Sequence, residues 1–237
     1  SVMHSTPVLL TQEGKILYSN GQLTTTSRKD YLMYGSTQGL LHIVDSNTGK
    51  EVFSFVPNEM MEKQRNAFLE ENSTTGGKAQ LFYGIDAPWT AHTQYVTKKD
   101  GTLTVNDSER KLTEEDDSLN LKGMQWVYGG LRMGGRSYYA LDLSDITKPS
   151  FKFQIDPDAD DASMALKQMG QSWSKPSLGY VKWDGEHKLV MFVGGGYDVE
   201  YEQELANPSI SKGNGVYMFD AENGDLLWWS SATSAAG

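Results

Sequence analysis

The sequence contains no cysteine among its 237 residues. This absence excludes disulfide cross-links, metal sites built from thiolates and a cysteine nucleophile. The chain also lacks any apolar run approaching the roughly 18 residues that a membrane-spanning helix requires. We therefore expect neither a disulfide scaffold nor insertion into a membrane.

Positive charge is scarce. The chain has 21 Lys and Arg against 31 Asp and Glu, which gives a net charge of −10. Its densest basic spots are two adjacent pairs, Arg28-Lys29 and Lys98-Lys99. Because phosphate backbones repel an acidic chain, we expect no nucleic-acid partner. The first residues, Ser1 to His4, include no initiator methionine at position 1 and do not resemble a signal peptide. We therefore expect the chain to be a piece of a longer protein.

Glycine and aromatic residues are abundant. The chain has 24 Gly, 8 Phe, 6 Trp and 12 Tyr, a composition typical of turns and half-buried strands rather than of a helical bundle. With 38% hydrophobic and 22% charged residues, the chain can bury a core and is not a disordered tail.

Three stretches of the chain share one order of features. Each has an apolar strand ending in Gly, a strand ending in Asp, a tight turn and an aromatic strand. A further strand with a proline near its start precedes each stretch, at Pro7, Pro88 and Pro176. Four strands repeated three times predict an all-β fold, a partial β-propeller of four-stranded antiparallel blades. The blades are expected over residues 1–57, 80–156 and 170–231.

Asp and Gly define the turns of the first and third units. In Asp45–Gly49 and Asp220–Gly224 the Asp carboxylate can accept backbone N–H groups, and the Gly can adopt a positive φ. We interpret these Asp residues as turn formers rather than ligands. The second unit lacks the Gly after Asp142 and continues to Pro149, which predicts a longer turn.

Insertions are expected over residues 58–79, 98–122 and 197–212. The first predicts a helix over Asn58–Asn72, capped by Asn58, with Met61, Phe68 and Leu69 on one face. The second predicts a short hairpin around Asp100-Gly101, and the third an acidic loop. Loops that project from a repeat scaffold commonly carry binding residues.

Three carboxylates are the candidate metal ligands: Asp156, Asp158 and Asp160. They place oxygens at positions 1, 3 and 5 of a calcium-type loop. Such a loop needs Gly at position 6 and Glu at position 12, where this chain has Asp161 and Lys167, so the EF-hand pattern fails. An irregular cation site stays open, and our default is a solvated acidic loop before a short helix over residues 162–168.

No catalytic or cofactor-binding residue is assigned. The glycine clusters match neither the dinucleotide nor the P-loop spacing, and we interpret them as strand ends and tight turns. No HExxH or GxSxG motif occurs. His42 lies within an apolar strand, where we expect a packed, hydrogen-bonded side chain rather than a ligand. These observations predict that the chain is not an enzyme.

Several motifs in one order resemble the PilC/PilY-type proteins of bacterial type IV pili. The first is Gly35-x-x-x-Gly39-Leu-Leu-His42-Ile-Val-Asp45. The later segments are Tyr83–Trp89, Gly129–Asp142, Trp173–Pro176 and Phe192–Tyr197. The resemblance extends from His4 to Trp229.

The resemblance implies a modified, quinoprotein-like propeller that acts as a non-enzymatic adhesin and pilus-biogenesis module. It implies a location at the pilus tip or outer membrane, reached through the periplasm. The implied partners are pilin or minor pilins and a receptor on a host cell or an abiotic surface. Some members of the family carry a calcium loop beyond the region that matches this chain. We therefore expect calcium in a longer protein and no cofactor within these residues.

Two other functions stay open. A quinone-cofactor-dependent dehydrogenase of similar blades would need a pocket on the propeller axis, a catalytic Asp and bound calcium, and such enzymes often carry adjacent cysteines that this chain lacks. A periplasmic assembly scaffold would differ from the adhesin mainly in its partner. Whatever the function, three blades leave blade faces and edge strands exposed. We therefore expect the segment alone to be marginally stable or to self-associate.

Overall fold

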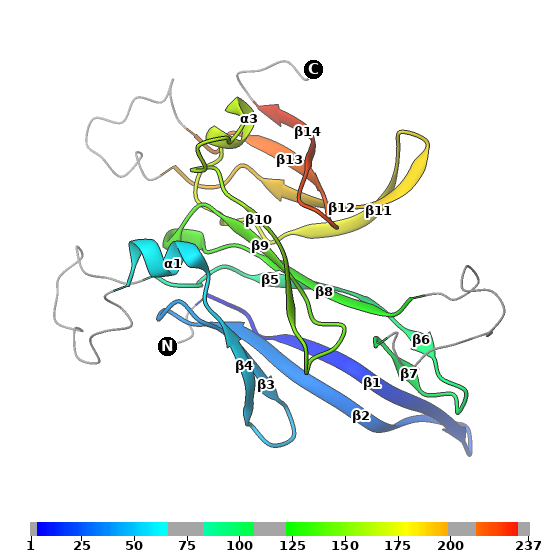
Figure 1. The fold of residues 1–237 in the computed structure, drawn as a ribbon. Helices are drawn as coiled ribbons and strands as arrows, with labels where there is room; N and C mark the ends of the chain where they lie inside the picture. The colour runs from blue at the N-terminus through cyan, green and yellow to red at the C-terminus, as the bar shows by residue number, and fades with distance from the viewer. Residues whose placement is uncertain (1–3, 66–82, 107–121, 199–211, 232–237) are drawn as a thin grey trace.

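The computed structural model describes residues 4–65, 83–106, 122–198 and 212–231. These residues are nearly all β and form three antiparallel sheets that lie one above another in Figure 1. No helix in this part of the chain is long and apolar enough to cross a bilayer.

Each sheet contains four strands that are consecutive neighbours, which confirms the predicted repeat of antiparallel four-stranded units. The first sheet holds β1 (Val8–Ser19), β2 (Gln22–Gly35), β3 (Leu41–Asp45) and β4 (Glu51–Phe55). The second holds β5 (Trp89–Gln94), β8 (Met124–Gly129), β9 (Tyr138–Asp142) and β10 (Ser150–Ile155). The third holds β11 (Ser177–Trp183), β12 (Glu186–Gly194), β13 (Gly215–Asp220) and β14 (Leu226–Ser231).

The first sheet has two additional strands, β6 (Val96–Thr97) and β7 (Leu103–Thr104). They form the hairpin predicted around Asp100-Gly101, in which Gly101 has a φ of +85°. β7 pairs with β1, opposite Glu13 and Gly14. The start of the 98–122 segment is therefore part of a sheet and not a separate insertion, because Val96 and Val105 on either side of the hairpin are buried. The rest of that segment, from residue 107, lies outside the described residues until Lys122.

The first insertion begins with a shorter helix than predicted, α1 (Asn58–Lys63). Asn58 does not cap it: the N-cap is Pro57, and the Asn58 side chain instead accepts a hydrogen bond from the Tyr139 hydroxyl (2.8 Å). The predicted apolar face was also wrong, since Met61 is 55% exposed and its neighbour Met60 is fully buried. Phe68 and Leu69 lie outside the described residues.

The helix ends at Lys63, and Gln64 after it has a non-helical backbone and hydrogen-bonds to two other segments. The residue has a φ of −130°, its amide nitrogen donates to the Gly134 carbonyl, and its amide oxygen accepts the Gly84 N–H. The described residues contain two other short helical segments, the 3-10 turn η4 (Arg132–Gly134) and α3 (Met164–Lys167). α3 lies within the predicted 162–168 helix and is capped by Ser163, whose hydroxyl accepts the Leu166 N–H.

The Asp-to-Gly turns have the predicted chemistry. The Asp45 carboxylate accepts the N–H groups of Asn47 and Thr48, and Gly49 has a φ of +68°. Asp220 closes the equivalent turn of the third sheet by accepting the Glu222 N–H (2.8 Å). These contacts confirm that the Asp residues form turns. The turn after Asp142 is longer, as predicted, because the next strand begins only at Ser150.

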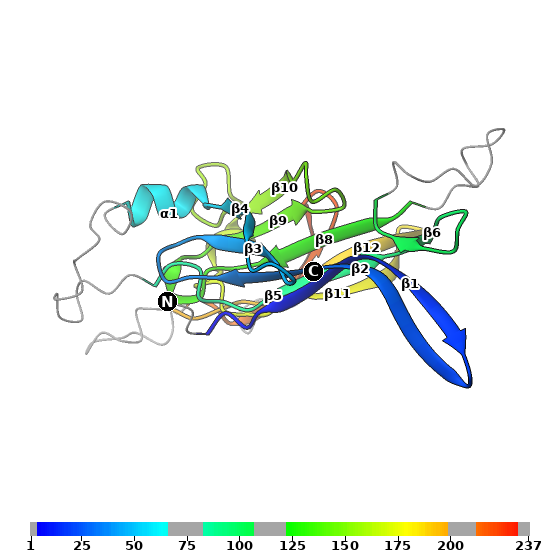
Figure 2. The same ribbon diagram turned by 90° about the horizontal axis from the view of Figure 1, so that it is seen from below.

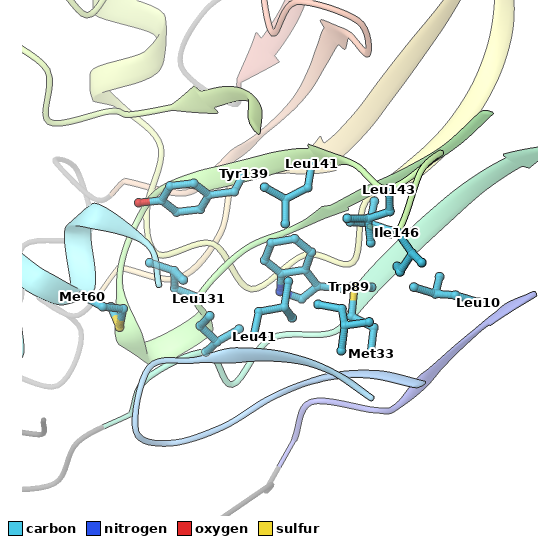
Figure 3. Close-up of a cluster of buried hydrophobic side chains, with 13 residues drawn as sticks. Leu10, Met33, Leu41, Met60, Trp89, Leu131, Tyr139, Leu141, Leu143 and Ile146 are labelled. Carbon is cyan, nitrogen blue, oxygen red and sulfur yellow. The ribbon is translucent and has the colours of Figure 1, made fainter. Parts of the chain in front are cut away.

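The second sheet is buried on both faces, and strand alternation divides its side chains between two cores. Val127 and Leu141 pack against the first sheet, whereas Tyr128 and Ala140 pack against the third. Figure 3 shows the core between the first two sheets, with Trp89 at its centre. The sheets are therefore joined by two separate apolar interfaces, one on each side of the second sheet.

Glycine at the end of β8 permits one of these interfaces. A Cβ atom on Gly129 would lie 2.2 Å from the Trp89 ring. The indole cannot easily move aside, because it is 2% exposed and its nitrogen donates to the Gly130 carbonyl (3.2 Å). Gly129 thus lies at a strand end, as predicted, and its lack of a side chain lets the Trp89 ring approach the backbone closely.

We predict that Gly129→Ala destabilises the fold by about 1–3 kcal/mol, as overpacking of a filled core does. The matched control is Gly179→Ala in β11, where the new methyl group would meet no atom within 4 Å. Urea unfolding followed by tryptophan fluorescence should show a lower midpoint for the first variant and an unchanged or higher one for the second. Equal midpoints for the two variants would show that Trp89 does not constrain this position.

Candidate functional site

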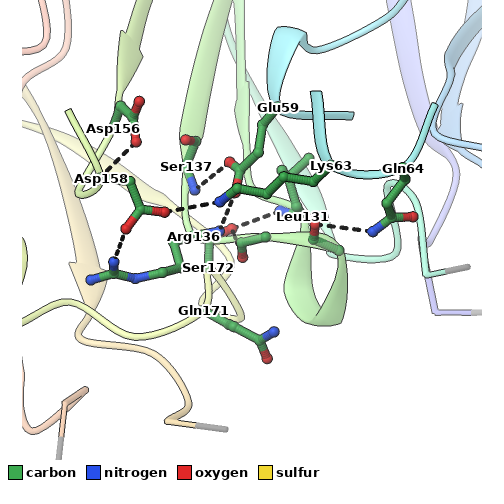
Figure 4. A network of polar contacts seen from close by, with 12 residues as sticks. Glu59, Lys63, Gln64, Leu131, Arg136, Ser137, Asp156, Asp158, Gln171 and Ser172 are labelled. Carbon is green, nitrogen blue, oxygen red and sulfur yellow. Dashed lines mark hydrogen bonds and ion pairs between the residues drawn. The ribbon is translucent and has the colours of Figure 1, made fainter. Parts of the chain in front are cut away.

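A network of charged side chains joins helix α1 to the second sheet and to the acidic loop after β10 (Figure 4). We call it the charged junction; its members are Glu59, Lys63, Arg136 and Asp158. The Glu59 side chain is 5% exposed, and its carboxylate accepts hydrogen bonds from Lys63 Nζ (2.8 Å) and from the backbone N–H groups of Arg136 (3.2 Å) and Ser137 (3.1 Å). The buried carboxylate is therefore hydrogen-bonded to the two residues just before β9 and to Lys63 of its own helix.

Arg136 connects the junction to helix α3. Its Nε donates to the Met169 carbonyl (3.1 Å), one terminal nitrogen donates to the Lys167 carbonyl (3.0 Å), and the other is paired with Asp158. A guanidinium can satisfy several acceptors at once because its donors are fixed in one plane. The side chain thus holds the C-terminal end of α3, the acidic loop and the second sheet together.

Asp158 carries the acidic end of the network. One of its oxygens accepts from Lys63 Nζ (2.9 Å), and the other is paired with Arg136. Burial by itself would raise the pKa of this carboxyl, but the hydrogen bond from Lys63 and the charge of Arg136 outweigh it and lower the pKa. Burial by itself would lower the pKa of Lys63, but its contacts with Glu59 and Asp158 outweigh burial and raise the pKa.

The three predicted metal ligands have different roles in the structure. Asp158 is paired with two cations, Asp156 accepts the Asp158 N–H (2.9 Å) within the loop, and Asp160 is exposed. No three acidic or histidine side chains among the described residues converge as a metal site. Around Asp158 the positive charge comes from Lys63 and Arg136.

A shallow pocket of about 400 Å³ opens beside the charged junction. It is lined by Arg136, Pro157, Asp158, Ala159, Asp160, Lys167 and Lys212. This mixture of basic and acidic groups suits polar contacts with a partner. It differs from the apolar, enclosed pockets that usually hold cofactors.

A second polar junction was missed by the sequence analysis. The Asp86 side chain is 3% exposed, accepts the His4 N–H (2.9 Å), and lies 2.7 Å from His4 Nδ1 and 3.0 Å from Arg132 Nη1. The Arg132 guanidinium lies 4.2 Å from the centre of the Trp173 ring, a cation–π contact. Arg132 also has a positive φ of +55°, which is uncommon outside glycine. The only sequence signal was that Asp86 and Trp173 lie in motif segments.

His42 is packed and hydrogen-bonded, as predicted. Its ring nitrogens contact Glu51 (2.5 Å) and Ser36 (3.2 Å), and its ring stacks on Tyr34. Burial raises the pKa of Tyr128, whose hydroxyl donates to the Ala221 carbonyl across the second interface. These ionisable groups join neighbouring strands and sheets.

Comparison with known proteins found relatives that are named type IV pilus biogenesis factors. No family model matches the chain. The PilY1 homologue of Xylella fastidiosa (strain Temecula1), named a type IV pilus biogenesis factor, is 27% identical over 201 residues, covering 80% of this chain and 14% of that protein. Type IV pilus biogenesis factor PilY1 of Pseudomonas aeruginosa (strain PAO1) is 26% identical over 183 residues, covering 76% of this chain and 12% of that protein. The chain therefore spans only a small part of the length of these relatives.

A solved structure shares the fold. The crystal structure of the Pseudomonas aeruginosa PilY1 C-terminal domain matches 89% of this chain with a TM-score of 0.51 and 19% sequence identity, over 32% of that domain. The match, with the three stacked four-stranded units, confirms the predicted fold class. The resemblance to PilC/PilY-type proteins is likewise confirmed by the homologues.

We predict that Arg136→Lys lowers the free energy of unfolding by about 1–3 kcal/mol, because an ammonium cannot replace the several charge-assisted hydrogen bonds of the guanidinium. The matched control is Arg28→Lys, which alters an exposed arginine paired with Asp30 and should leave the unfolding midpoint nearly unchanged. Chemical unfolding of both variants measures the difference. A loss that is no larger for Arg136 than for Arg28 would mean that the charged junction contributes little.

We predict that part of the acid sensitivity of the fold comes from Asp158. The pKa of Asp158 is lower in the folded state than in the unfolded chain, where an Asp titrates at about 3.9. Its stabilising contribution is therefore present above that pH and lost as the pH falls through the folded pKa. Asp158→Asn should reduce the difference between the unfolding midpoints at neutral pH and at about pH 3. Asp160→Asn, an exposed carboxyl on the same loop, is the control; an equal effect of both substitutions would contradict the assignment.

Proposed function

Because the homologues of this chain are type IV pilus biogenesis factors of the PilY1 kind, we propose that it is a non-enzymatic module of a pilus tip adhesin and biogenesis protein. In this proposal the protein reaches the bacterial surface through the periplasm. There it promotes pilus extension and attaches to a host cell or an abiotic surface. Its partners are pilin or minor pilins and a surface receptor.

The observation that carries the proposal is that similarity to pilus biogenesis factors extends over most of the chain. The match with the Xylella relative covers 80% of this chain, and the fold match with a PilY1 domain covers 89% of this chain. The similarity is therefore not confined to one short motif. A pilus-associated role follows from the homologues, and the proposal adds the adhesive activity and the tip location.

The described side chains support a binding module. The charged junction and the Asp86 junction use their ionisable groups to hold sheets and loops together, and the pocket beside the charged junction is open and polar. A rigid stack of sheets that presents polar loops suits adhesion to a partner surface. The quinone-dependent dehydrogenase stays the alternative to be tested, and no observed feature favours it.

We predict that replacing residues 4–231 with a Gly/Ser linker in the full-length gene reduces surface pili and attachment. Pili should be counted by electron microscopy in the bacterium that encodes the protein and in the same strain made unable to retract pili. The control is the full-length gene carrying Gly179→Ala, which should retain both properties. Normal numbers of pili with normal attachment in the linker strain would contradict the proposal.

A separate assay addresses the enzymatic alternative. The full-length protein is supplied with a pyrroloquinoline quinone cofactor, calcium and an alcohol or sugar, and reduction of a dye is followed. We expect no turnover above that of heat-treated protein. Reproducible turnover that is lost on heating would make the dehydrogenase the better interpretation.

A further inference from the structure

The first two strands form a hairpin that extends far beyond the first sheet. β1 and β2 pair with each other from Val8 to Ser19, but β3 pairs only with residues 31–35 of β2, and β7 pairs only with Glu13 and Gly14 of β1. From Lys15 to Thr26 the two strands are therefore paired only with each other within the described part of the chain. Figure 2 shows this end of the hairpin projecting from the stacked sheets. We call residues 16–27 the arm.

The arm carries no charged residue and has one apolar face. Residues 16–27 contain no Asp, Glu, Lys or Arg, although the whole chain has a net charge of −10. Tyr18 pairs with Leu23 and Ile16 with Thr25, so Ile16, Tyr18 and Leu23 lie on one face. Their exposed fractions are 56% for Ile16 and 73% for both Tyr18 and Leu23. Three large apolar side chains thus form one exposed face of a projecting element.

Ion pairs and hydrogen bonds fix the base of the arm. Arg28 Nε donates to Asp30 (2.9 Å), and Asp30 also accepts from the Thr11 hydroxyl (2.6 Å). On the other side Glu13 is paired with Lys29 and Lys98. The register shifts between Thr11 and Glu13 and again between Glu13 and Lys15, and at the second shift Ser27 has a φ of +54°. Such a bulge bends a hairpin and directs its end, so the arm has a fixed base and a defined direction.

The arm lacks the features that normally protect such an element. A two-stranded hairpin on its own is marginally stable in water. Exposed strand edges are usually protected by charged residues, by proline or by a covering segment. The arm has no charge and no proline, and in the described structure neither of its edges is paired. Packing against a partner would cover both its apolar face and its edges.

The uncharged face and the unpaired edges of the arm indicate which kind of partner could cover it. A lipid bilayer would leave the unpaired N–H and C=O groups of both edges without hydrogen bonds, which is costly in hydrocarbon. A charged protein surface would lose its own solvation against an apolar face. The arm needs an uncharged, apolar strand with an open edge, and the chain itself supplies one in the arm of a second copy.

We propose that the arm is a dimerisation element, and that two copies of the chain associate by packing their arms together. The contact is self-complementary, as a two-fold symmetric interface requires. Because the arm projects from the sheets, its end can meet a second arm while the two acidic bodies stay apart, beyond much of their screened repulsion. The contact is small, so the dimer is weak and depends on concentration. This inference is independent of the proposed function.

The decisive experiment is sedimentation equilibrium of the 237-residue chain over a wide range of concentrations. We expect a monomer–dimer equilibrium that strengthens as salt is raised, because salt screens the acidic bodies and the contact itself is uncharged. Tyr18→Thr combined with Leu23→Thr should weaken dimerisation by tenfold or more while keeping residues that favour strands. The matched control is Val216→Thr on the third sheet, which replaces a 47% exposed apolar residue outside the arm and should leave dimerisation unchanged.

A chemical cross-link provides the second readout. Because the chain has no cysteine, Thr25→Cys introduces a single thiol on the apolar face of the arm, and a short bismaleimide should then link two copies. Val216→Cys should give little cross-linked dimer. A chain that stays monomeric at every concentration would overturn the proposal, as would dimerisation lost in the Val216→Thr variant and kept in the arm variant. Binding of the monomer to phospholipid vesicles that the Tyr18 and Leu23 substitutions abolish would point to a membrane instead.

Discussion

The structure depends on burial of the second sheet on both faces. Along β8 and β9, one set of alternate side chains reaches the core shared with the first sheet and the other set reaches the core shared with the third. Both faces therefore carry large buried side chains such as Tyr128 and Tyr139, and the buried polar residue of β8, Gln125, is hydrogen-bonded to Gln12 and Thr93. Close approach of the sheets then requires glycine where β8 passes Trp89.

The charged groups follow from this packing. Loops that connect stacked sheets must leave the apolar interfaces at their ends, and there the buried carboxylates of Glu59 and Asp86 are satisfied by backbone N–H groups and by basic side chains. Buried charges are tolerated only with such partners. Asp158 is 42% exposed, and its oxygens balance Lys63 and Arg136, which the helix and the second sheet bring to the loop.

The sequence predicted what local patterns encode. Gly-ended strands and Asp turns gave the three units, because turn chemistry is decided within a few residues. The role of Asp158 was not predictable in this way, since Lys63 lies 95 residues away in the chain. The predicted N-cap of α1 was wrong for a similar reason. Asn58 is a residue type that often caps helices, but its side chain accepts a hydrogen bond from the hydroxyl of Tyr139, which is distant in the sequence. The pairing of β7 with β1 also escaped prediction, because two-residue strands carry too short a pattern.

The arm differs from the other exposed apolar positions. The outer face of the third sheet leaves Val216 exposed but buries Val190 and Met218 on the same side, so a sheet can partly cover its own outer face. A two-stranded hairpin has no further strand whose side chains could cover its apolar face. Tyr18 and Leu23 therefore stay 73% exposed although they are paired with each other. In a stack stabilised by contacts between neighbouring units, end sheets lose one interface, whereas the arm has none. The unprotected arm therefore demands a functional explanation more strongly than the open sheet faces do.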